Sequence, residues 1–139
     1  MGFGQALVSG FKNYVNFSGR SPRSAYWYWV LWMIILGFVA GMLDAVIDVV
    51  LGSDHYITIG HNQYGPLGTI ITLATFLPGL ALCIRRLHDV DRSGWWFLIV
   101  LTIFGCIFVI YWACTKGTAG PNRFGPDPLG GELNQPAAA

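Results

Sequence analysis

The chain has 139 residues, of which 54% are hydrophobic and only 11% are charged. Soluble domains carry about 25% charged residues, so this composition, with a mean hydropathy of +0.53, predicts a membrane protein. The net charge of +1 argues against a nucleic-acid partner, because phosphate binding needs a clustered surplus of Lys and Arg.

Residues at about 2–17 are predicted to form an amphipathic helix. Its apolar residues recur at helical spacing: Phe3, Leu7, Phe11, Tyr14 and Val15. Polar residues occupy the other side. Two interpretations of this helix are open. It lies in the plane of the membrane interface, or it packs against other cytoplasmic segments of the protein.

Three apolar runs follow, at about 25–51, 67–84 and 95–114. Each is near the roughly 20 residues that cross a bilayer, and the first exceeds the apolar core of a signal peptide, so we expect an uncleaved anchor. The predicted fold is an all-α integral membrane helical bundle, with three transmembrane helices plus the N-terminal amphipathic helix. It is expected to form a single membrane domain over residues 1–128, followed by a disordered tail at 129–139.

The positions of the basic residues predict the orientation, since short cytoplasmic loops are enriched in Lys and Arg. The segments before the first run and after the second contain six of them: Lys12, Arg20, Arg23, Arg85, Arg86 and Arg92. The segment 53–66 contains none. We therefore expect a multi-pass protein with a cytoplasmic N-terminus and with residues 53–66 outside.

The third apolar run has two interpretations. A plain span leaves the C-terminal segment outside, although that segment carries Lys116 and Arg123. A re-entrant hairpin that turns near Gly105 returns it to the cytoplasm. We favour the plain span, because the backbone at such a turn must be sheltered by protein.

Three longer motifs support a family resemblance: "FSGRSPRSAYW" at 17–27, "RRLHDVDRSGWW" at 85–96 and "GTAGPNRFGPDP" at 117–128. With these motifs the chain resembles the domain-of-unknown-function 805 family of small bacterial inner-membrane proteins. The matching positions are Gly19, Arg20, Arg23, Tyr26 and Trp27, then Arg85, Arg86, Leu87, His88, Asp89, Arg92, Ser93, Gly94 and Trp96, and finally Asn122, Arg123, Phe124, Gly125, Asp127 and Pro128. The resemblance implies a helical fold and an inner-membrane location, and it implies no reaction.

The second motif concentrates charge between two apolar runs, and its basic residues are all Arg. Arg is preferred where a planar fork binds carboxylate or phosphate. The candidate residues are Arg20, Arg23, Arg85, Arg86, His88, Asp89, Asp91 and Arg92. The favoured interpretation is an internal polar network at the cytoplasmic face. The alternatives are a site for anionic lipid head groups and charges that serve only to orient the chain.

Several residue pairs carry weaker signals for chemistry. His88 with Asp89 has no accompanying nucleophile, and Asp89 with Asp91 has no further ligands at a diagnostic spacing. His55 and His61 lack acidic or Cys neighbours that would favour a metal. We therefore expect no catalytic residues, metal or cofactor. The three cysteines, which are Cys83, Cys106 and Cys114, are predicted to be free thiols.

The first apolar run contains two further features. Asp44 is a candidate intramembrane carboxylate, which by default indicates an ion or proton path. Asp48, one turn later, is predicted to be solvated near the outer end of the helix. Gly37 and Gly41 form a small-xxx-small pattern for close packing, either against another span or against a second copy of the chain.

The expected protein is a non-enzymatic component of the bacterial inner membrane, with a structural or accessory function and no established biochemical activity. The expected partners are membrane lipids, anionic lipids among them, and either another membrane protein or a homo-oligomer. The alternative is a transporter or channel component that uses Asp44.

Overall fold

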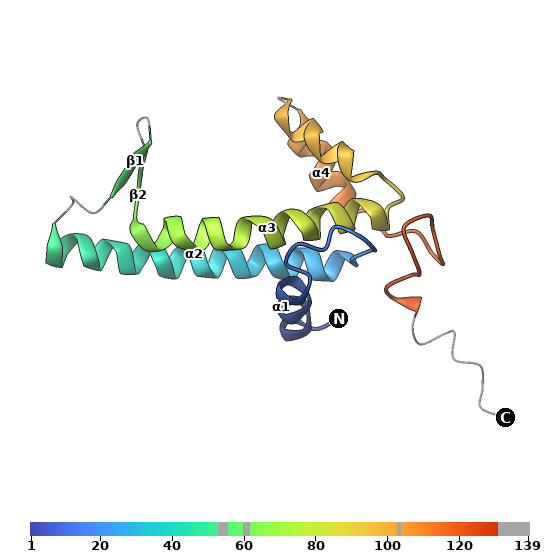
Figure 1. Ribbon diagram of the computed structural model, residues 1–139, viewed down its shortest axis with the longest axis horizontal. Helices are drawn as coiled ribbons and strands as arrows, with labels where there is room; N and C mark the ends of the chain where they lie inside the picture. The colour runs from blue at the N-terminus through green and yellow to red at the C-terminus, as the bar shows by residue number, and fades with distance from the viewer. Residues whose placement is uncertain (53–55, 60–61, 103, 131–139) are drawn as a thin grey trace. The chain divides into compact units, whose positions relative to one another are not determined.

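The computed structural model describes residues 1–52, 56–59, 62–102 and 104–130 (Figure 1). The elements in chain order are α1 (Phe3–Lys12), α2 (Arg23–Leu51), β1 (Ile57–Ile59), β2 (Asn62–Tyr64), α3 (Pro66–Asp89), the 3₁₀ helix η2 (Gly94–Leu101) and α4 (Gly105–Cys114). The predicted helical character is confirmed. Between α2 and α3 the chain also contains a short antiparallel hairpin, in which Ile57 pairs with Tyr64.

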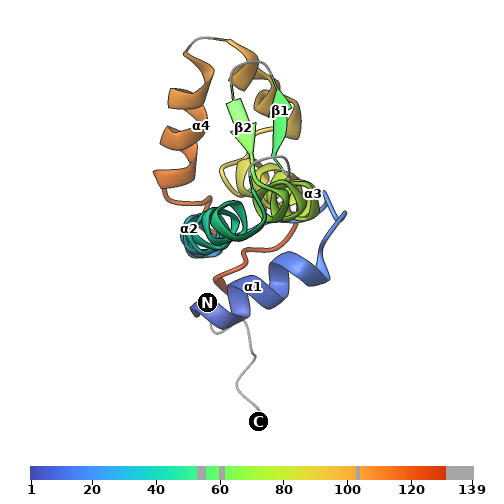
Figure 2. The same ribbon diagram turned by 90° about the vertical axis from the view of Figure 1, so that its left-hand side faces the viewer.

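The chain divides into two compact units. Unit 1 comprises Met1–Trp29 and Pro78–Ala139, and unit 2 comprises Val30–Leu77. In unit 2, the α2 segment after Trp29 and the α3 segment before Pro78 run side by side in opposite directions (Figures 1 and 2). Both helices begin and end within a few residues of the runs predicted from the sequence.

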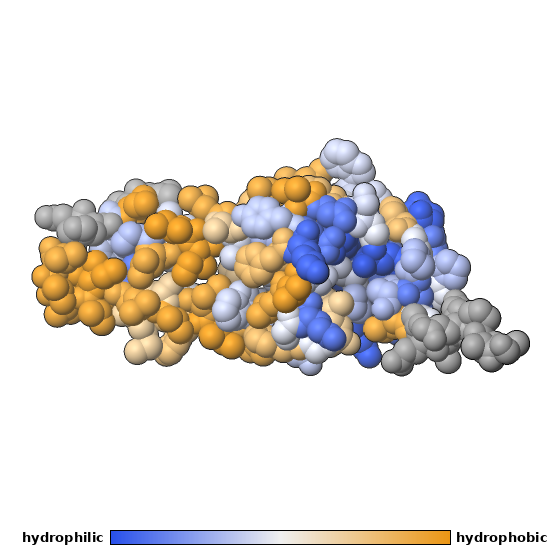
Figure 3. Space-filling view, turned by 60° about the horizontal axis from the view of Figure 1, so that its bottom comes forward, coloured by the Kyte–Doolittle hydropathy of each residue, from blue (hydrophilic) through white to orange (hydrophobic). Residues whose placement is uncertain are grey.

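Helices α2 and α3 are long and apolar enough to cross a membrane. Only 11% and 28% of their most apolar windows are buried, so neither resembles the core helix of a soluble domain. In unit 2, large side chains such as Phe38 (69% exposed) and Leu73 (71% exposed) face outward, and hydrophobic side chains cover the face of these helices in Figure 3. Such a continuous apolar surface is typical of a membrane or protein interface.

In unit 1, α1 packs against the first turns of α2. Ala6 and Gly10 are its buried residues, and a Cβ atom at Gly10 would lie 2.5 Å from the Trp29 ring. The Phe11 and Trp29 ring centroids are 5.2 Å apart. Of the two open interpretations, the structure therefore shows packing against another segment, while Val8 remains 55% exposed.

Helix α1 is shorter than the predicted range of about 2–17. It ends at Lys12 because Asn13 closes its last turn: both the backbone N–H and the side-chain amide of Asn13 donate to the Ser9 carbonyl. The apolar periodicity continues to Val15, but the local capping interaction stops the helix first.

The prediction of one continuous helix over 95–114 is wrong. This run forms two helices, η2 and α4, which pack against each other. The Trp96 and Trp112 rings meet edge to face at 5.6 Å between centroids. A Cβ atom at Gly105 would lie 1.5 Å from the Ile99 carbonyl oxygen, so only glycine allows the two backbones to approach. The two helices of this run therefore pack side by side near Gly105, and the three-span count is unconfirmed.

Replacing Gly105 by alanine is expected to loosen this packing. The added methyl group has no room against a backbone carbonyl, and overpacking of this kind costs about 1–3 kcal/mol. Thermal unfolding in detergent, followed by circular dichroism, should show a lower melting temperature. Gly41→Ala is the matched control, since a Cβ at Gly41 meets nothing within 4 Å. Equal melting temperatures for the two variants would contradict the close packing at Gly105.

Candidate functional site

Three charged side chains of unit 1 form a buried cluster, here called the Asp89 cluster: Arg20, Arg86 and Asp89. Asp89 is the last residue of α3, Arg86 lies one turn earlier, and Arg20 comes from the loop between α1 and α2. Arg20 Nε donates to Asp89 Oδ1 at 3.0 Å, and Arg86 Nη1 donates to Asp89 Oδ2. The three side chains are only 1–4% exposed, so one carboxylate balances two charges away from water.

The Nη groups of both arginines also bind main-chain carbonyls at the end of α4 and in the C-terminal segment, whereas Arg86 Nε has no partner among the described residues. Arg20 Nη1 donates to the Gly120 carbonyl at 2.6 Å, and its Nη2 donates to the Thr118 carbonyl. Arg86 Nη2 donates to the carbonyls of Thr115 and, at 3.1 Å, Trp112. Both guanidinium groups therefore use their planar fork to hold main-chain acceptors, and they fasten the segment after α4 to the end of α3.

Asp89 also holds this segment through its backbone. The Thr118 N–H donates to the Asp89 carbonyl at 2.8 Å. A Cβ atom at Gly117 would lie 2.2 Å from Asp89 Oδ2, so a glycine at this position lets the segment pass directly over the carboxylate. The C-terminal segment therefore packs directly against the cluster.

A second layer of contacts surrounds His88. Its Nδ1 lies 3.1 Å from the Gly19 carbonyl, and its ring stacks on Phe124 with 3.9 Å between centroids and an interplanar angle of 3°. Asn122 donates to the His88 carbonyl at 2.9 Å. The loop 18–22, the end of α3 and the segment 115–127 are thus tied together at several independent points.

Farther along, Asp127 organises the last described turn. The backbone N–H groups of Leu129 and Gly120 donate to its carboxylate, and these hydrogen bonds hold the pKa of Asp127 below its ordinary value. Leu129 therefore takes part in a defined turn, although it was predicted to begin the disordered tail. Residues 131–139, the rest of that predicted tail, lie outside the described residues, as do His55 and His61.

The structure separates other candidate residues from the Asp89 cluster. Arg23 is exposed at the start of α2, and Arg92 lies over the Trp112 ring at 5.7 Å. Asp91 pairs with Arg123 at 3.1 Å on the surface, where both side chains are more than half exposed. Arg85 is buried, and its Nη2 has no hydrogen-bond partner among the described residues.

The weaker chemical signals find no support in this geometry. His88 contacts Gly19 and Phe124 through its ring rather than the Asp89 carboxylate. Asp89 and Asp91 bind different arginines, so they do not form a carboxylate pair. Within the described ranges, no three His, Cys, Asp or Glu side chains gather closely enough to hold a metal ion.

Asp44 in unit 2 has a structural environment of its own. Although it lies within α2, its carboxylate accepts hydrogen bonds from the N–H groups of Leu67 and Gly68, both at 3.0 Å. These residues belong to the first turn of α3, where free N–H groups and the helix dipole favour a negative charge. A Cβ atom at Gly65 would lie 2.0 Å from Asp44 Oδ2. Asp44 therefore caps α3 and ties it to α2.

Within the described part of unit 2, Gly37 and Gly41 do not pack against another segment. Both are exposed, and a Cβ atom at either position would meet nothing within 4 Å. The buried positions of this stretch are Ala40 and Asp44, which lie on a different face of α2. Packing of these glycines, against another span or against a second copy of the chain, therefore stays a prediction.

Several residues of the site were not among the candidates from the sequence. They are Trp112, Thr115, Gly117, Thr118, Gly120, Asn122, Arg123, Phe124 and Asp127. Most of them lie in the motif "GTAGPNRFGPDP". That motif was the available signal, but the main-chain carbonyls that bind the arginines have no signature in side-chain chemistry.

These features define a class: a helical membrane protein in which a buried Arg–Asp cluster ties together the loop before α2, the end of α3 and the segment after α4. The chain belongs to the DUF805 family, described as proteins of unknown function, whose family model matches residues 14–126. The resemblance seen in the sequence is thereby confirmed. The matched region contains the whole Asp89 cluster and every main-chain carbonyl that its arginines bind.

Two bacterial relatives agree with this membership. The chain is 44% identical over 121 residues to the inner membrane protein YhaH of Escherichia coli K12, covering 84% of this chain and 90% of the relative. It is 42% identical over 125 residues to the inner membrane protein YhaI of the same strain, covering 89% and 95%. No solved structure matches the chain.

Proposed function

We propose that this chain is a non-enzymatic accessory protein of the bacterial inner membrane, which presents a rigid cytoplasmic cap to a larger membrane complex. The cap comprises the loop 18–22, the end of α3 and the segment 115–127. One observation carries the proposal: Arg20 and Arg86 use their donors on Asp89 and on main-chain carbonyls. Guanidinium groups that are bound within the protein in this way stabilise its local structure, and they are poorly placed to bind and release a substrate.

The proposed topology has two membrane crossings, α2 and α3, and a re-entrant hairpin formed by η2 and α4. The cluster supports this arrangement, because Arg20 before α2 and Thr118 after α4 bind each other and must lie on one side of the membrane. All eight Lys and Arg residues of the chain then lie in the cytoplasm, as the positive-inside rule favours. Packing of η2 against α4 shelters backbone that a lone turn would expose.

Cysteine labelling tests this topology in intact cells. After replacement of the three native cysteines by serine or alanine, a cysteine at Asn62 is expected to react with a membrane-impermeant thiol reagent. Cysteines at Val90 and Ala119 should be protected until the cells are permeabilised. Labelling of Ala119→Cys from outside would contradict the re-entrant hairpin, and protection of Asn62→Cys would contradict the orientation.

The arginines differ in their availability to anionic lipid. Arg20 and Arg86 are buried and bound within the protein, whereas Arg23 and Arg92 are exposed. Association with anionic head groups, where it occurs, is therefore proposed for the exposed pair, with attraction on the order of 1 kcal/mol per residue. For Asp44 we propose a structural function rather than transport, since both of its oxygens accept main-chain N–H groups.

Purification of the tagged full-length protein from native membranes, with mass spectrometry of proteins and lipids, tests the accessory function. A membrane protein is expected to copurify in a fixed ratio. Asp89→Asn should lose this partner, because the variant loosens the cap. Asp91→Asn, which makes the same chemical change at an exposed pair, should retain it. A protein that purifies alone from native membranes would overturn the proposal.

A further inference from the structure

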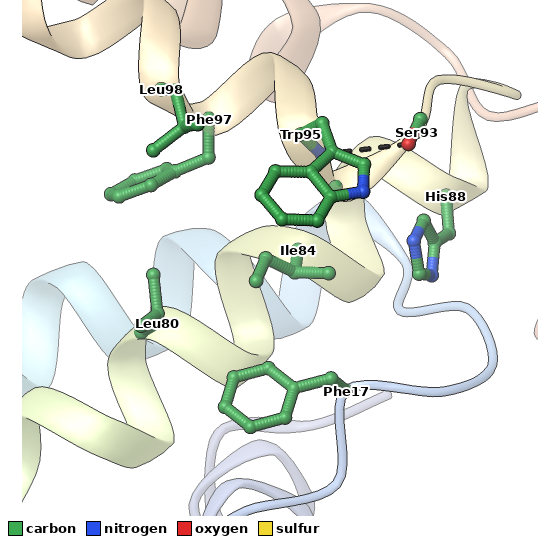
Figure 4. Close-up of a pocket in the computed structure, with 9 residues that line it drawn as sticks. Phe17, Leu80, Ile84, His88, Ser93, Trp95, Phe97 and Leu98 are labelled. Carbon is green, nitrogen blue, oxygen red and sulfur yellow. Dashed lines mark hydrogen bonds between the residues drawn. The ribbon is translucent and has the colours of Figure 1, made fainter.

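Unit 1 contains an apolar groove of about 460 Å³ between α3, η2 and the loop after α1 (Figure 4). Its walls are formed mainly by Phe17, Leu80, Ile84, Trp95, Phe97 and Leu98. This volume lies within the range of sites that bind small molecules. The groove is separate from the Asp89 cluster, and neither the proposed cap nor the topology requires it.

The polar residues of the groove lie at one end. Figure 4 shows His88 and Ser93 at that end, and Leu80, Phe97 and Leu98 at the other. His88 is fixed by Gly19 and Phe124, and its Nε2 would lie 3.5 Å from a Cβ atom at Gly94, which also lines the groove. The site thus matches a long apolar molecule that ends in a polar group.

The exposed surface beside the groove indicates where such a molecule would come from. Helix η2 has the sequence GWWFLIVL, and its Trp95 and Leu101 are 80% and 85% exposed. A continuous apolar surface of this kind is unfavourable in water and is covered by hydrocarbon in a membrane. Leu98 is 52% exposed and belongs both to this surface and to the groove, so the groove is continuous with it.

We propose that the groove binds one acyl chain of a membrane phospholipid, with the phosphate and ester region at His88 and Ser93. The hydroxyl of Ser93 donates to a phosphate or ester oxygen. Arg92, the exposed residue before Ser93, brings a positive charge to the same segment. The bound lipid fills the space between η2 and the last turns of α3, and it would therefore hold the re-entrant hairpin against α3.

The test uses the full-length protein in vesicles of phosphatidylethanolamine and phosphatidylglycerol, with a trace of phosphatidylglycerol that carries a diazirine in its acyl chain. After irradiation and proteolysis, mass spectrometry is expected to find adducts concentrated in residues 80–98 and suppressed by excess unlabelled lipid. Adducts spread evenly over exposed apolar residues, such as Leu73 (71% exposed), would overturn the proposal, because they indicate only bulk lipid.

Two groove-filling variants make the test specific. Leu98→Trp should lower adduct formation on residues 80–88 about tenfold, which corresponds to roughly 1.4 kcal/mol of binding free energy. Leu101→Trp is the matched control on the same helix, outside the groove lining, and should leave the adducts unchanged. Leu80→Trp fills the groove from α3 and should act like Leu98→Trp. The proposal would be overturned if a variant that fills the groove melts normally and leaves the lipid adducts unchanged. It would also be overturned if such a variant loses a copurifying protein without any change in its lipid adducts.

Discussion

Asp89→Asn is expected to lower the free energy of unfolding by about 3–5 kcal/mol, because removing one partner of a buried ion pair leaves uncompensated charge. The asparagine keeps the volume of the side chain but removes the charge that balances Arg20 and Arg86. Denaturant titration of the purified protein in detergent measures this change. Proteolysis should also become faster within residues 115–127, the segment that the cluster holds.

Asp91→Asn is the control for this prediction. Asp91 forms a comparable ion pair with Arg123, but the two side chains are 51% and 60% exposed. Exposed pairs contribute about 0–1 kcal/mol, so little change in stability and no change in proteolysis are expected. A loss of stability as large for Asp91→Asn as for Asp89→Asn would show that burial does not set the strength of the cluster.

Asp44→Asn is expected to cost about 2–3 kcal/mol, in the range of hydrogen bonds to charged groups. An asparagine has one oxygen, so it can accept from either Leu67 or Gly68 but places its own donors against the other N–H. It also removes the negative charge that the N-terminus of α3 favours. Denaturation in detergent measures the loss, and hydrogen exchange should increase in the first turn of α3.

Asp48→Asn is the matched control, since Asp48 lies one turn farther along α2 and is only partly buried. Its replacement is expected to change stability by less than about 0.5 kcal/mol, as for most surface positions. Reconstitution in proteoliposomes distinguishes the capping function from transport. Ion or proton flux in the unmodified protein that disappears in Asp44→Asn without loss of stability would contradict capping and favour the transport alternative.

The sequence predicted the two long helices well, and the reason is local. Apolar runs of sufficient length become helices in a membrane whatever they pack against, because a backbone in hydrocarbon must satisfy its own hydrogen bonds. The predicted runs 25–51 and 67–84 therefore fall within α2 (Arg23–Leu51) and α3 (Pro66–Asp89). The same argument could not distinguish a span from a hairpin at 95–114, since both satisfy the apolar composition.

The sequence also selected Arg20, Arg86 and Asp89 as candidates, but it could not separate Arg86 from Arg85. Adjacent residues on a helix point about 100° apart, so only one of the two faces Asp89 and the C-terminal segment. Which one does so depends on the rotation of α3 within unit 1. That rotation is fixed by packing and by the main-chain carbonyls of Trp112 and Thr115, which Arg86 binds.

By itself, therefore, the sequence determined the membrane character, the two long helices and the segments that carry most of the basic residues, before the first apolar run and after the second. These follow from hydropathy and from residue type, which are properties of short segments. Only the tertiary structure decided that η2 and α4 pack together at Gly105, that Asp44 caps α3 and that Asp89 holds the C-terminal segment. Each of these depends on main-chain groups such as the Ile99 carbonyl or the Gly68 N–H. Such groups are shared by nearly all residue types, so they become specific only when folding brings them into contact.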